Sequence, residues 1–348
     1  MTIPGPVELI GSPGSPYTRK MLSLLRYRHI PHRVIWGDPA TILRQRGVAV
    51  PKLVFLPTFV FRDESDKPVA RSDSTPIIRE LEQAFAGRSV LPADPALAFI
   101  DYLLEDFADE WCTKYMFHYR WHFEQDADNA GSLLPLYADL TVAQNDWQQL
   151  KDVFSERQIG RLRYVGSSEE TAPVIDASYQ RLLHALELHF AGLPFLLGHR
   201  PGAGDFALFG QFSQLVGFDP TPRAIAHAIS PRTVAWVDLM EDHSGLQPDD
   251  SGWQDTAALP ESLGGILAEV GRVYAPALLA NAQAVESKQG HWTAEIDGCE
   301  WHQQAFPYQA KCLGWIKEQY CALDPGSRAR VDELLSGTGC ERMLHPTG

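Results

Sequence analysis

The chain has 348 residues, of which 45% are hydrophobic and 21% are charged, and its net charge is −14 at pH 7. This length suits two domains with a sizeable core, and the composition is ordinary for a soluble globular protein. The acidic balance argues against a nucleic-acid-binding protein, because no surplus of Lys and Arg is present to neutralise phosphates. No run of eighteen apolar residues occurs, so we expect no membrane span and no membrane partner.

The cysteines indicate a reducing compartment. There are five, an uneven number for a disulfide framework, and no two of them form a CxxC pair. No His and Cys spacing suits a metal ion, so we expect no metal. The first six residues lack the basic start and apolar core of a signal peptide, and we therefore expect a cytoplasmic protein.

The first stretch with a clear chemical meaning runs from residue 7 to residue 28. Val7, Leu9 and Ile10 are apolar and predict a short buried strand over residues 7–10, and apolar residues at helical spacing follow from Met21. Between them, Ser15 stands at an N-cap position and Pro16 at the first helical position. The free N–H groups of such a helix start favour an anion or an ionised nucleophile, although for Ser15 taken alone a simple cap is the favoured interpretation.

The rest of the first domain alternates strands and helices. A polar turn at residues 63–67 predicts a hairpin between its last two strands. The expected order is strand 7–10, helix 16–28, strand 33–36, a helical stretch 39–47, strands 53–61 and 68–71, and helix 75–86.

Three motifs in this order resemble the glutathione transferase family. The first is Ser15-Pro16-Tyr17-Thr18, followed by the basic pair Arg19-Lys20. The second is Leu56-Pro57-Thr58, which matches the cis-proline that begins the third strand of that family. The third is Asp73-Ser74, at the start of the third helix. Three ordered motifs in one β-α-β and β-β-α frame are far more specific than any one of them.

The resemblance implies a role for each motif. Ser15 would donate its hydroxyl to the sulfur of glutathione and stabilise the thiolate, with Ser12 and Tyr17 as competing donors and Ser15 favoured over Ser12. Leu56 would present its backbone N–H and C=O to the peptide beside the cis bond to Pro57. Asp73 and Ser74 would cap the third helix and hold the γ-glutamyl end. Glutathione is therefore the expected co-substrate.

Pro51 competes with Pro57 for the cis position, because Val50-Pro51 also resembles the family's Val-Pro. We favour Pro57, since Pro51 leaves an over-long gap to Asp73. We therefore expect Leu56-Pro57 to be cis and Val50-Pro51 to be trans.

After a breaker-rich link at residues 87–95 the chain is almost entirely helical in pattern. A long helix is expected over residues 95–122, with aromatic residues at three- and four-residue steps. Such a stripe is ordinarily core. In the resembled family, however, this helix lines the electrophile pocket. The resemblance therefore implies that some of the side chains of Trp111, Tyr115, His118 and Tyr119 line that pocket.

Farther along, residues 125–168 contain no clear motif and read as an insertion with short helices, and residues 171–190 form a helix with one apolar face. The sequence at Gly202 and Asp205 resembles the family's second capping motif, except that Gly202 stands where Ser or Thr is usual. We expect Asp205 to be structural.

The end of the chain is longer than is usual in that family. We expect helices over residues 231–242 and over residues 266–286, the latter kinked at Pro276. The tail is too apolar to be disordered, and helices are expected at 309–320 and 327–335. They pack back onto the body, or they cover the mouth of the site.

Taken together, the sequence predicts an α/β thioredoxin-like N-terminal domain over residues 1–88 and an all-α helical C-terminal domain over residues 95–290. Residues 291–348 form a C-terminal extension packed on the body. The function implied is that of a cytoplasmic, homodimeric glutathione S-transferase acting on a small hydrophobic electrophile. The alternatives are a non-catalytic binding or scaffold protein, and a glutathione-dependent lyase, isomerase or dehalogenase.

Overall fold

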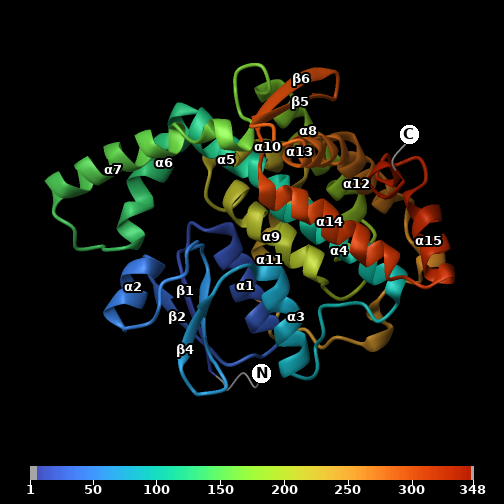
Figure 1. Ribbon diagram of the computed structural model, residues 1–348, viewed down its shortest axis with the longest axis horizontal. Coiled ribbons are helices and arrows are strands. Elements are labelled where there is room, and N and C mark those ends of the chain that lie inside the picture. The colour runs from blue at the N-terminus through green and yellow to red at the C-terminus, as the bar shows by residue number, and fades with distance from the viewer. Residues whose placement is uncertain (1–5, 346–348) are drawn as a thin grey trace.

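The computed structural model describes residues 6–345, and it begins with a thioredoxin-like domain (Figure 1). Its four-stranded sheet has the order β2-β1-β3-β4, in which β1 pairs parallel with β2 and antiparallel with β3, and β3 pairs antiparallel with β4. This is the predicted arrangement. The elements are β1 (Val7–Gly11), α1 (Pro16–Tyr27), β2 (His32–Trp36), α2 (Pro39–Gln45), β3 (Thr58–Arg62), β4 (Pro68–Arg71) and α3 (Ser74–Ala84).

Side chains that point alternately to the two sides of each strand give the sheet two buried faces. On one face Leu9 and Phe59 join the large core that includes α1 and α3. On the other face Ile10 packs with Leu43 of α2. Because successive side chains of a strand point to opposite faces, β1 serves both cores.

A largely helical region follows and lies above the sheet in Figure 1. Helix α9 packs against both α1 and α4, which joins the two parts of the molecule. The helices of this helical region are α4 (Pro95–Glu110), α5 (Cys112–His122), α6 (Glu124–Leu133), α7 (Gln144–Ile159), α8 (Ala172–Phe190), α9 (Ala203–Leu215), α10 (Pro220–Ile229), α11 (Pro231–Met240), α12 (Glu261–Glu269) and α13 (Ala275–Glu286). Short turns of helix occur at η1 (Pro135–Tyr137), η2 (Leu162–Val165), η3 (Asp250–Gly252), η4 (Thr256–Ala258) and η5 (Val270–Tyr274).

The prediction of one long helix over residues 95–122 is wrong in one respect. The helix breaks at Trp111 into α4 and α5. Two backbone carbonyls just before the break are occupied by side chains. The Tyr17 hydroxyl donates to the carbonyl of Asp109 at 2.8 Å, and the amide of Gln309 reaches that of Glu110 at 3.4 Å. These partners lie far away in the sequence, so the helical periodicity gave no sign of the break.

The kink expected near Pro276 occurs one turn earlier, as the π-helical turn η5. Proline lacks the N–H that would close the preceding turn, and a π-turn shifts the hydrogen bonding accordingly. Residues Glu261–Glu286 are the one helical stretch among those described with the length and mean hydropathy, 1.3, of a membrane span. Since 61% of that window is buried inside the protein, a core helix accounts for it.

The extension contains a β-hairpin that we did not predict, β5 (His291–Ile296) and β6 (Cys299–Gln304). Its turn is formed by Asp297 and Gly298, both at positive φ, 52° and 77°. Asp-Gly between two strands is a strong hairpin signal, so the sequence did carry this information. The helices expected in the tail are confirmed as α14 (Pro307–Cys321) and α15 (Pro325–Leu335), followed by α16 (Glu341–Leu344). Both α14 and α15 pack against α4.

The structural role predicted for Asp205 is confirmed, and the unusual glycine has a physical reason. The buried Asp205 carboxylate accepts from the backbone N–H groups of Leu196 and Gly202, each at 2.9 Å. Asp101 of α4 accepts from those of Ala203 and Gly204, at 3.2 and 3.0 Å, and so caps α9 from another helix. A Cβ atom at Gly202 would lie 2.3 Å from the Asp101 carboxylate, so a Ser or Thr there would push Asp101 away from its bonds to α9.

Gly202→Ser restores the residue usual in the resembled family, yet we expect it to lower the free energy of unfolding by about 1–3 kcal/mol through overpacking. Urea denaturation of wild type and variant measures this. Gly245→Ser is the matched control, because a Cβ at Gly245 meets nothing within 4 Å. A Gly202→Ser protein as stable as the control would contradict the proposed clash with Asp101.

Candidate functional site

Ser15 lies at the start of α1 and is nearly buried, with 7% of its surface exposed. Its hydroxyl oxygen accepts from the backbone N–H of Thr18 at 3.2 Å, which is the predicted N-cap bond. A cap of this kind uses a lone pair of the hydroxyl oxygen and leaves its hydrogen available. That hydrogen points to a distant acceptor, the carbonyl of Leu56 at 3.5 Å.

The loop before Ser15 is clamped by the helical region. Gln214 of α9 donates to the carbonyl of Pro13 at 3.2 Å, and Arg120 of α5 donates to that of Gly14 at 3.0 Å. A Cβ atom at Gly14 would lie 2.2 Å from the side chain of Leu134. The motif-free segment 125–168 therefore includes residues that cover the Ser15 loop.

The cis bond is where we predicted it, since Leu56-Pro57 is the cis peptide among the described residues. It lies directly before β3, whose Thr58 pairs with Ile10 near the end of β1. The contact between Ser15 and Leu56 joins the first two motifs. The exposed side chains of Leu53 and Phe55 precede the cis bond and give this edge an apolar surface.

The third motif behaves differently from our expectation at Asp73. This residue stands at the N-cap position of α3, but its side chain makes no cap hydrogen bond. Its backbone has φ 89° and ψ 105°, and the hydroxyl of Tyr308 in α14 donates to its carboxylate at 2.9 Å. Burial raises the pKa of Asp73, and the bond from Tyr308 opposes that change.

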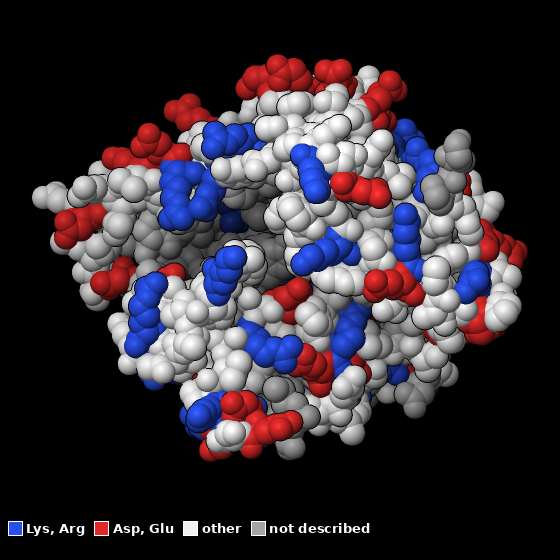
Figure 2. All heavy atoms as spheres, viewed as in Figure 1, with Lys and Arg blue, Asp and Glu red and all other residues white. Residues whose placement is uncertain are grey.

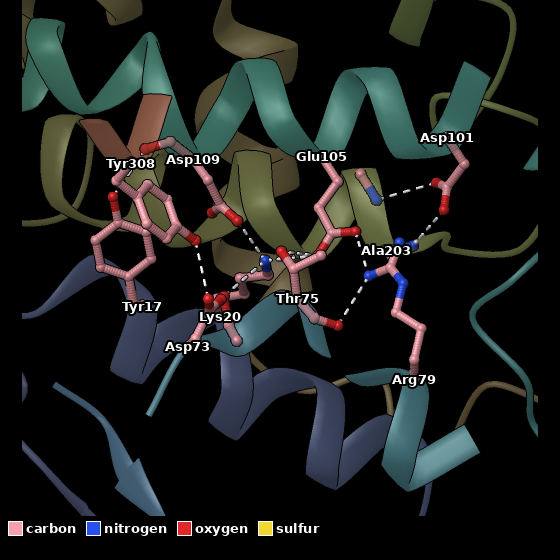
Figure 3. A network of polar contacts seen from close by, with 12 residues as sticks. Tyr17, Lys20, Asp73, Thr75, Arg79, Asp101, Glu105, Asp109, Ala203 and Tyr308 are labelled. Atoms are coloured by element: carbon pink, nitrogen blue, oxygen red, sulfur yellow. Dashed lines mark hydrogen bonds and ion pairs between the residues drawn. The ribbon is translucent and has the colours of Figure 1, made fainter. Parts of the chain in front are cut away.

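Ser74 is tied to the first motif through Lys20 (Figure 3). The buried ammonium of Lys20 donates to the Ser74 hydroxyl at 3.0 Å, to Glu105 at 2.9 Å and to Asp109 at 2.6 Å. Burial alone lowers the pKa of Lys20, but Asp109 and Glu105 outweigh it and the pKa is raised. The three motifs thus meet around the first turns of α1.

The two competing donors differ in their environment. Ser12 is half-buried, and its backbone N–H donates to the hydroxyl of Thr18 at 3.4 Å. The hydroxyl of Tyr17 donates to the carbonyl of Asp109 at 2.8 Å (Figure 3). The hydrogen of the Tyr17 hydroxyl is therefore engaged toward α4.

A hollow opens between the N-terminal domain and the helices α5 and α6, with Lys and Arg side chains around it (Figure 2). A separate pocket of about 420 Å³ lies between the end of α5, α6 and α7. None of the three motifs lines that pocket. Its lining residues are Trp121, His122, Phe123, Glu124, Ala127, Asp128, Lys151, Asp152, Ser155 and Ile159.

Comparison with known families identifies the first domain. Residues 9–89 match the family model described as glutathione S-transferase, N-terminal domain. Residues 9–89 are thus similar to the N-terminal domain of glutathione S-transferases. The match spans all three motifs, from the strand before Ser15 to the helix that begins at Ser74. No curated protein matches the chain.

Several solved structures are similar to the chain at low identity. A glutathione transferase-like protein from Pseudomonas syringae is 14% identical, with a TM-score of 0.45 over 69% of this chain and 67% of that one. A tau class glutathione S-transferase from mango is 16% identical, with a TM-score of 0.39 over 75% and 98%. A family member from Pseudomonas fluorescens, solved with two glutathione molecules bound, is 15% identical, with a TM-score of 0.38 over 67% and 86%. The likeness to glutathione S-transferases therefore rests on the match of residues 9–89.

The aromatic residues expected to line a pocket of this transferase fold lie in the core instead. Trp111, Tyr115, Tyr119 and His118 are each at most 1% exposed. The indole of Trp111 donates to the Tyr115 hydroxyl at 2.9 Å, and His118 bonds to Ser167 at 2.8 Å. The helical periodicity of these residues is thus that of packing, the ordinary reading of such a stripe.

Residues beyond the motifs also build the site, and the sequence gave little sign of them. Lys20 belonged to a recognised basic pair, but nothing indicated that it is buried. Arg120 and Leu134 lie in unremarkable helical sequence, and Tyr308 lies in the extension. Each reaches the site through contacts with residues more than fifty positions away, which no local pattern encodes.

Helix α4 carries acidic side chains that burial keeps partly protonated near neutral pH. Burial raises the pKa of Asp101 and that of Glu110 to about 8, and that of Asp106 to about 7. Asp106 accepts from the Tyr274 hydroxyl at 2.6 Å, and Glu110 accepts from the Gln309 amide at 3.0 Å. These bonds fasten η5 and the extension to α4. Among the side chains that the structure describes, no group of His, Cys, Asp and Glu is suited to a metal ion.

Glu110→Gln should change how stability depends on pH. The folded-state pKa of Glu110 is raised, so its proton stabilises the fold at low pH, and that contribution is lost as the pH rises toward 8. The free energy of unfolding of wild type should therefore fall relative to Glu110→Gln between pH 6 and 8, by at most about 1.4 kcal/mol per pH unit. Chemical denaturation across this range measures it, with exposed Glu64→Gln as control. Parallel curves for Glu110→Gln and wild type would refute the raised pKa.

Proposed function

We propose that this protein is a glutathione transferase-like enzyme. It would bind glutathione beside Ser15, ionise its thiol, and direct the thiolate to a small hydrophobic electrophile. In that reaction the sulfur forms a bond to an electrophilic carbon, and a leaving group departs with the bonding electrons or a double bond is saturated. The thiol proton passes to solvent.

The observation that carries this proposal is the convergence of the three motifs. Ser15 contacts the carbonyl of Leu56 beside the cis bond, and Lys20, five residues after Ser15, holds the hydroxyl of Ser74. The helix starts at Ser15 and at Ser74 both offer backbone N–H groups to an anion. A ligand with an anionic sulfur and an anionic carboxylate is suited to such a pair of sites.

The position of the Ser15 hydroxyl supports a role as a donor to sulfur. A free thiol has a pKa near 8.5, so only a few per cent of it is thiolate at neutral pH. The Ser15 oxygen is occupied by the cap bond from Thr18, while its hydrogen has only the distant Leu56 carbonyl. A sulfur placed closer than that carbonyl would take the hydrogen, and the helix start would favour its ionised form.

The surface around the site suits the two proposed substrates. Lys and Arg side chains border the hollow in Figure 2, although the chain as a whole has a net charge of −14. Such a local positive field attracts an anionic tripeptide. The exposed apolar side chains of Leu53 and Phe55 offer contact area to a hydrophobic electrophile.

We also propose the organisation that the resemblance implies. The thioredoxin-like unit would comprise residues 1–88 and the helical unit residues 95–290, with residues 291–348 as an extension. The protein would act in the cytoplasm as a homodimer. A lyase, isomerase or dehalogenase would use the same thiolate on another electrophile.

A non-catalytic binding protein is the second candidate. The near-complete burial of Ser15 favours it, because it restricts the approach of a bound thiol to the Ser15 hydroxyl. The two candidates differ in whether the bound thiol becomes ionised.

Asp73→Ala should weaken the binding of glutathione by about 1.5–3 kcal/mol, the usual contribution of a hydrogen bond to a charged group. Isothermal titration calorimetry measures the change. Asp66→Ala, in the exposed turn between β3 and β4, serves as control. An unchanged affinity of Asp73→Ala would remove Asp73 from the proposed γ-glutamyl site.

Ser15→Ala tests the chemistry itself. In wild type, bound glutathione should titrate below its solution pKa, as followed by thiolate absorbance in the ultraviolet. Ser15→Ala should lose part of that shift in pKa. Its turnover should be lower, because the activation free energy rises by a few kcal/mol, while the affinity for glutathione changes little.

The control for Ser15→Ala is Ser230→Ala, which removes another serine cap, that of α11. It should cost a similar stability, about 1 kcal/mol, without any change at the thiol. If wild type binds glutathione with an unshifted thiol, and Ser15→Ala behaves identically, the enzyme proposal is wrong and the binding protein is the better candidate.

A further inference from the structure

The extension reaches the proposed glutathione site at one point. Tyr308, the second residue of α14, donates its hydroxyl to the carboxylate of Asp73 at 2.9 Å. Both side chains are half-buried. Figure 3 shows the Tyr308 ring coming down from α14 onto the start of α3. Two residues 235 positions apart are thus joined at the third motif.

The position of Tyr308 is fixed by neighbouring helices. Asn281 of α13 donates to the carbonyl of Phe306 at 2.9 Å and accepts from its N–H at 2.7 Å, which holds the backbone at the start of α14. Gln309 donates to Glu110 of α4 at 3.0 Å. The Tyr308 ring packs edge-on against Trp315, with ring centroids 5.8 Å apart. The backbone and the ring of Tyr308 are therefore held in place by contacts with α13, α4 and Trp315.

The contact with Tyr308 is one of two that face the Asp73 carboxylate. A positive φ of 89° is unusual for a residue other than glycine, and the side chain makes no N-cap hydrogen bond. The Tyr308 hydroxyl and the backbone N–H of Thr75 both act to lower the pKa of Asp73 against the effect of burial. A carboxylate has about four acceptor positions, and the Tyr308 hydroxyl takes one of them. The contact therefore directs the carboxylate without filling it.

The charged groups around Asp73 leave its carboxylate available for a cation. Lys20 on α1 is the nearest cation of the network, but its three N–H hydrogens are given to Ser74, Glu105 and Asp109. Glu105 and Asp109 on α4 are acidic. From α14 Asp73 meets a neutral phenol. Among the contacts drawn in Figure 3, the Asp73 carboxylate accepts from a neutral phenol, so a ligand ammonium arriving here would meet an acidic group.

We propose that Tyr308 of the C-terminal extension is a positioning residue for substrate binding, which holds the Asp73 carboxylate toward the α-ammonium of the γ-glutamyl group. This inference rests on the proposed function, since it assigns a role within the same glutathione site. The extension would then be part of the binding site, and it would select ligands that carry a free α-amino group.

Tyr308→Phe keeps the ring and removes the hydroxyl. We expect it to weaken glutathione binding by about 3- to 10-fold in calorimetry. The affinity for deaminated glutathione, in which hydrogen replaces the α-amino group, should equal that of wild type. The matched control is Tyr320→Phe on the same helix, whose hydroxyl bonds to Asp332 at 2.6 Å, and it should leave both affinities unchanged. In an Asp73→Asn background, Tyr308→Phe should have no further effect on glutathione.

Each other outcome has a distinct meaning. An equal loss for both ligands in Tyr308→Phe would show a merely structural role and overturn the inference. Unchanged or tighter glutathione binding would also overturn it, and tighter binding would mean that Tyr308 competes with the ligand. If wild type binds neither ligand, the proposed function itself fails, which differs from a wild type that binds glutathione while Tyr308→Phe binds it equally well.

Discussion

The buried ammonium of Lys20 is the interaction on which the arrangement of the site depends. Its side chain is fully buried, and it joins α1 to the start of α3 through Ser74 and to α4 through Glu105 and Asp109. Removing one partner of a buried ion pair is strongly destabilising, because the remaining charge keeps its desolvation cost without its compensation. Lys20 therefore fixes the two halves of the proposed glutathione site relative to each other and to the helical region.

Helix α4 continues this role on its other side, where it receives the extension. Its carboxyl groups bond to Tyr274 of η5 and to Gln309 of α14, and burial leaves several of them partly protonated near neutral pH. A protonated carboxyl group is neutral and can be buried at much lower cost than a carboxylate. The same helix thus presents ionised acids to Lys20 and more neutral ones to the tail, which makes the extension an integral layer of the molecule.

The capping of α9 shows how a departure from a family pattern can have a purely local cause. Asp101 projects from α4 into the space where a Ser or Thr side chain would lie at residue 202, and it satisfies the first N–H groups of α9 itself. Gly202 is therefore the residue that fits. At Asp73, too, a residue from a distant part of the chain takes part, because the Tyr308 hydroxyl donates to its carboxylate while no N-cap hydrogen bond is made.

The sequence by itself determined the thioredoxin-like domain, the cis bond at Leu56-Pro57, the cap at Ser15 and the structural role of Asp205. The cap at Ser15 follows from the unsatisfied N–H groups at a helix start. The thioredoxin-like domain, the cis bond and the role of Asp205 were implied by the resemblance of the ordered motifs, which are short stretches of sequence set within periodic strands and helices. The Asp297-Gly298 hairpin was also encoded locally, and our prediction missed it. Only the tertiary structure decided that Trp111 interrupts a helix, that the aromatic stripe of α5 is core, and that Lys20 and Tyr308 meet the motifs. Those outcomes depend on side chains that approach from distant parts of the chain, and their burial and pairing have no signature in the sequence around them.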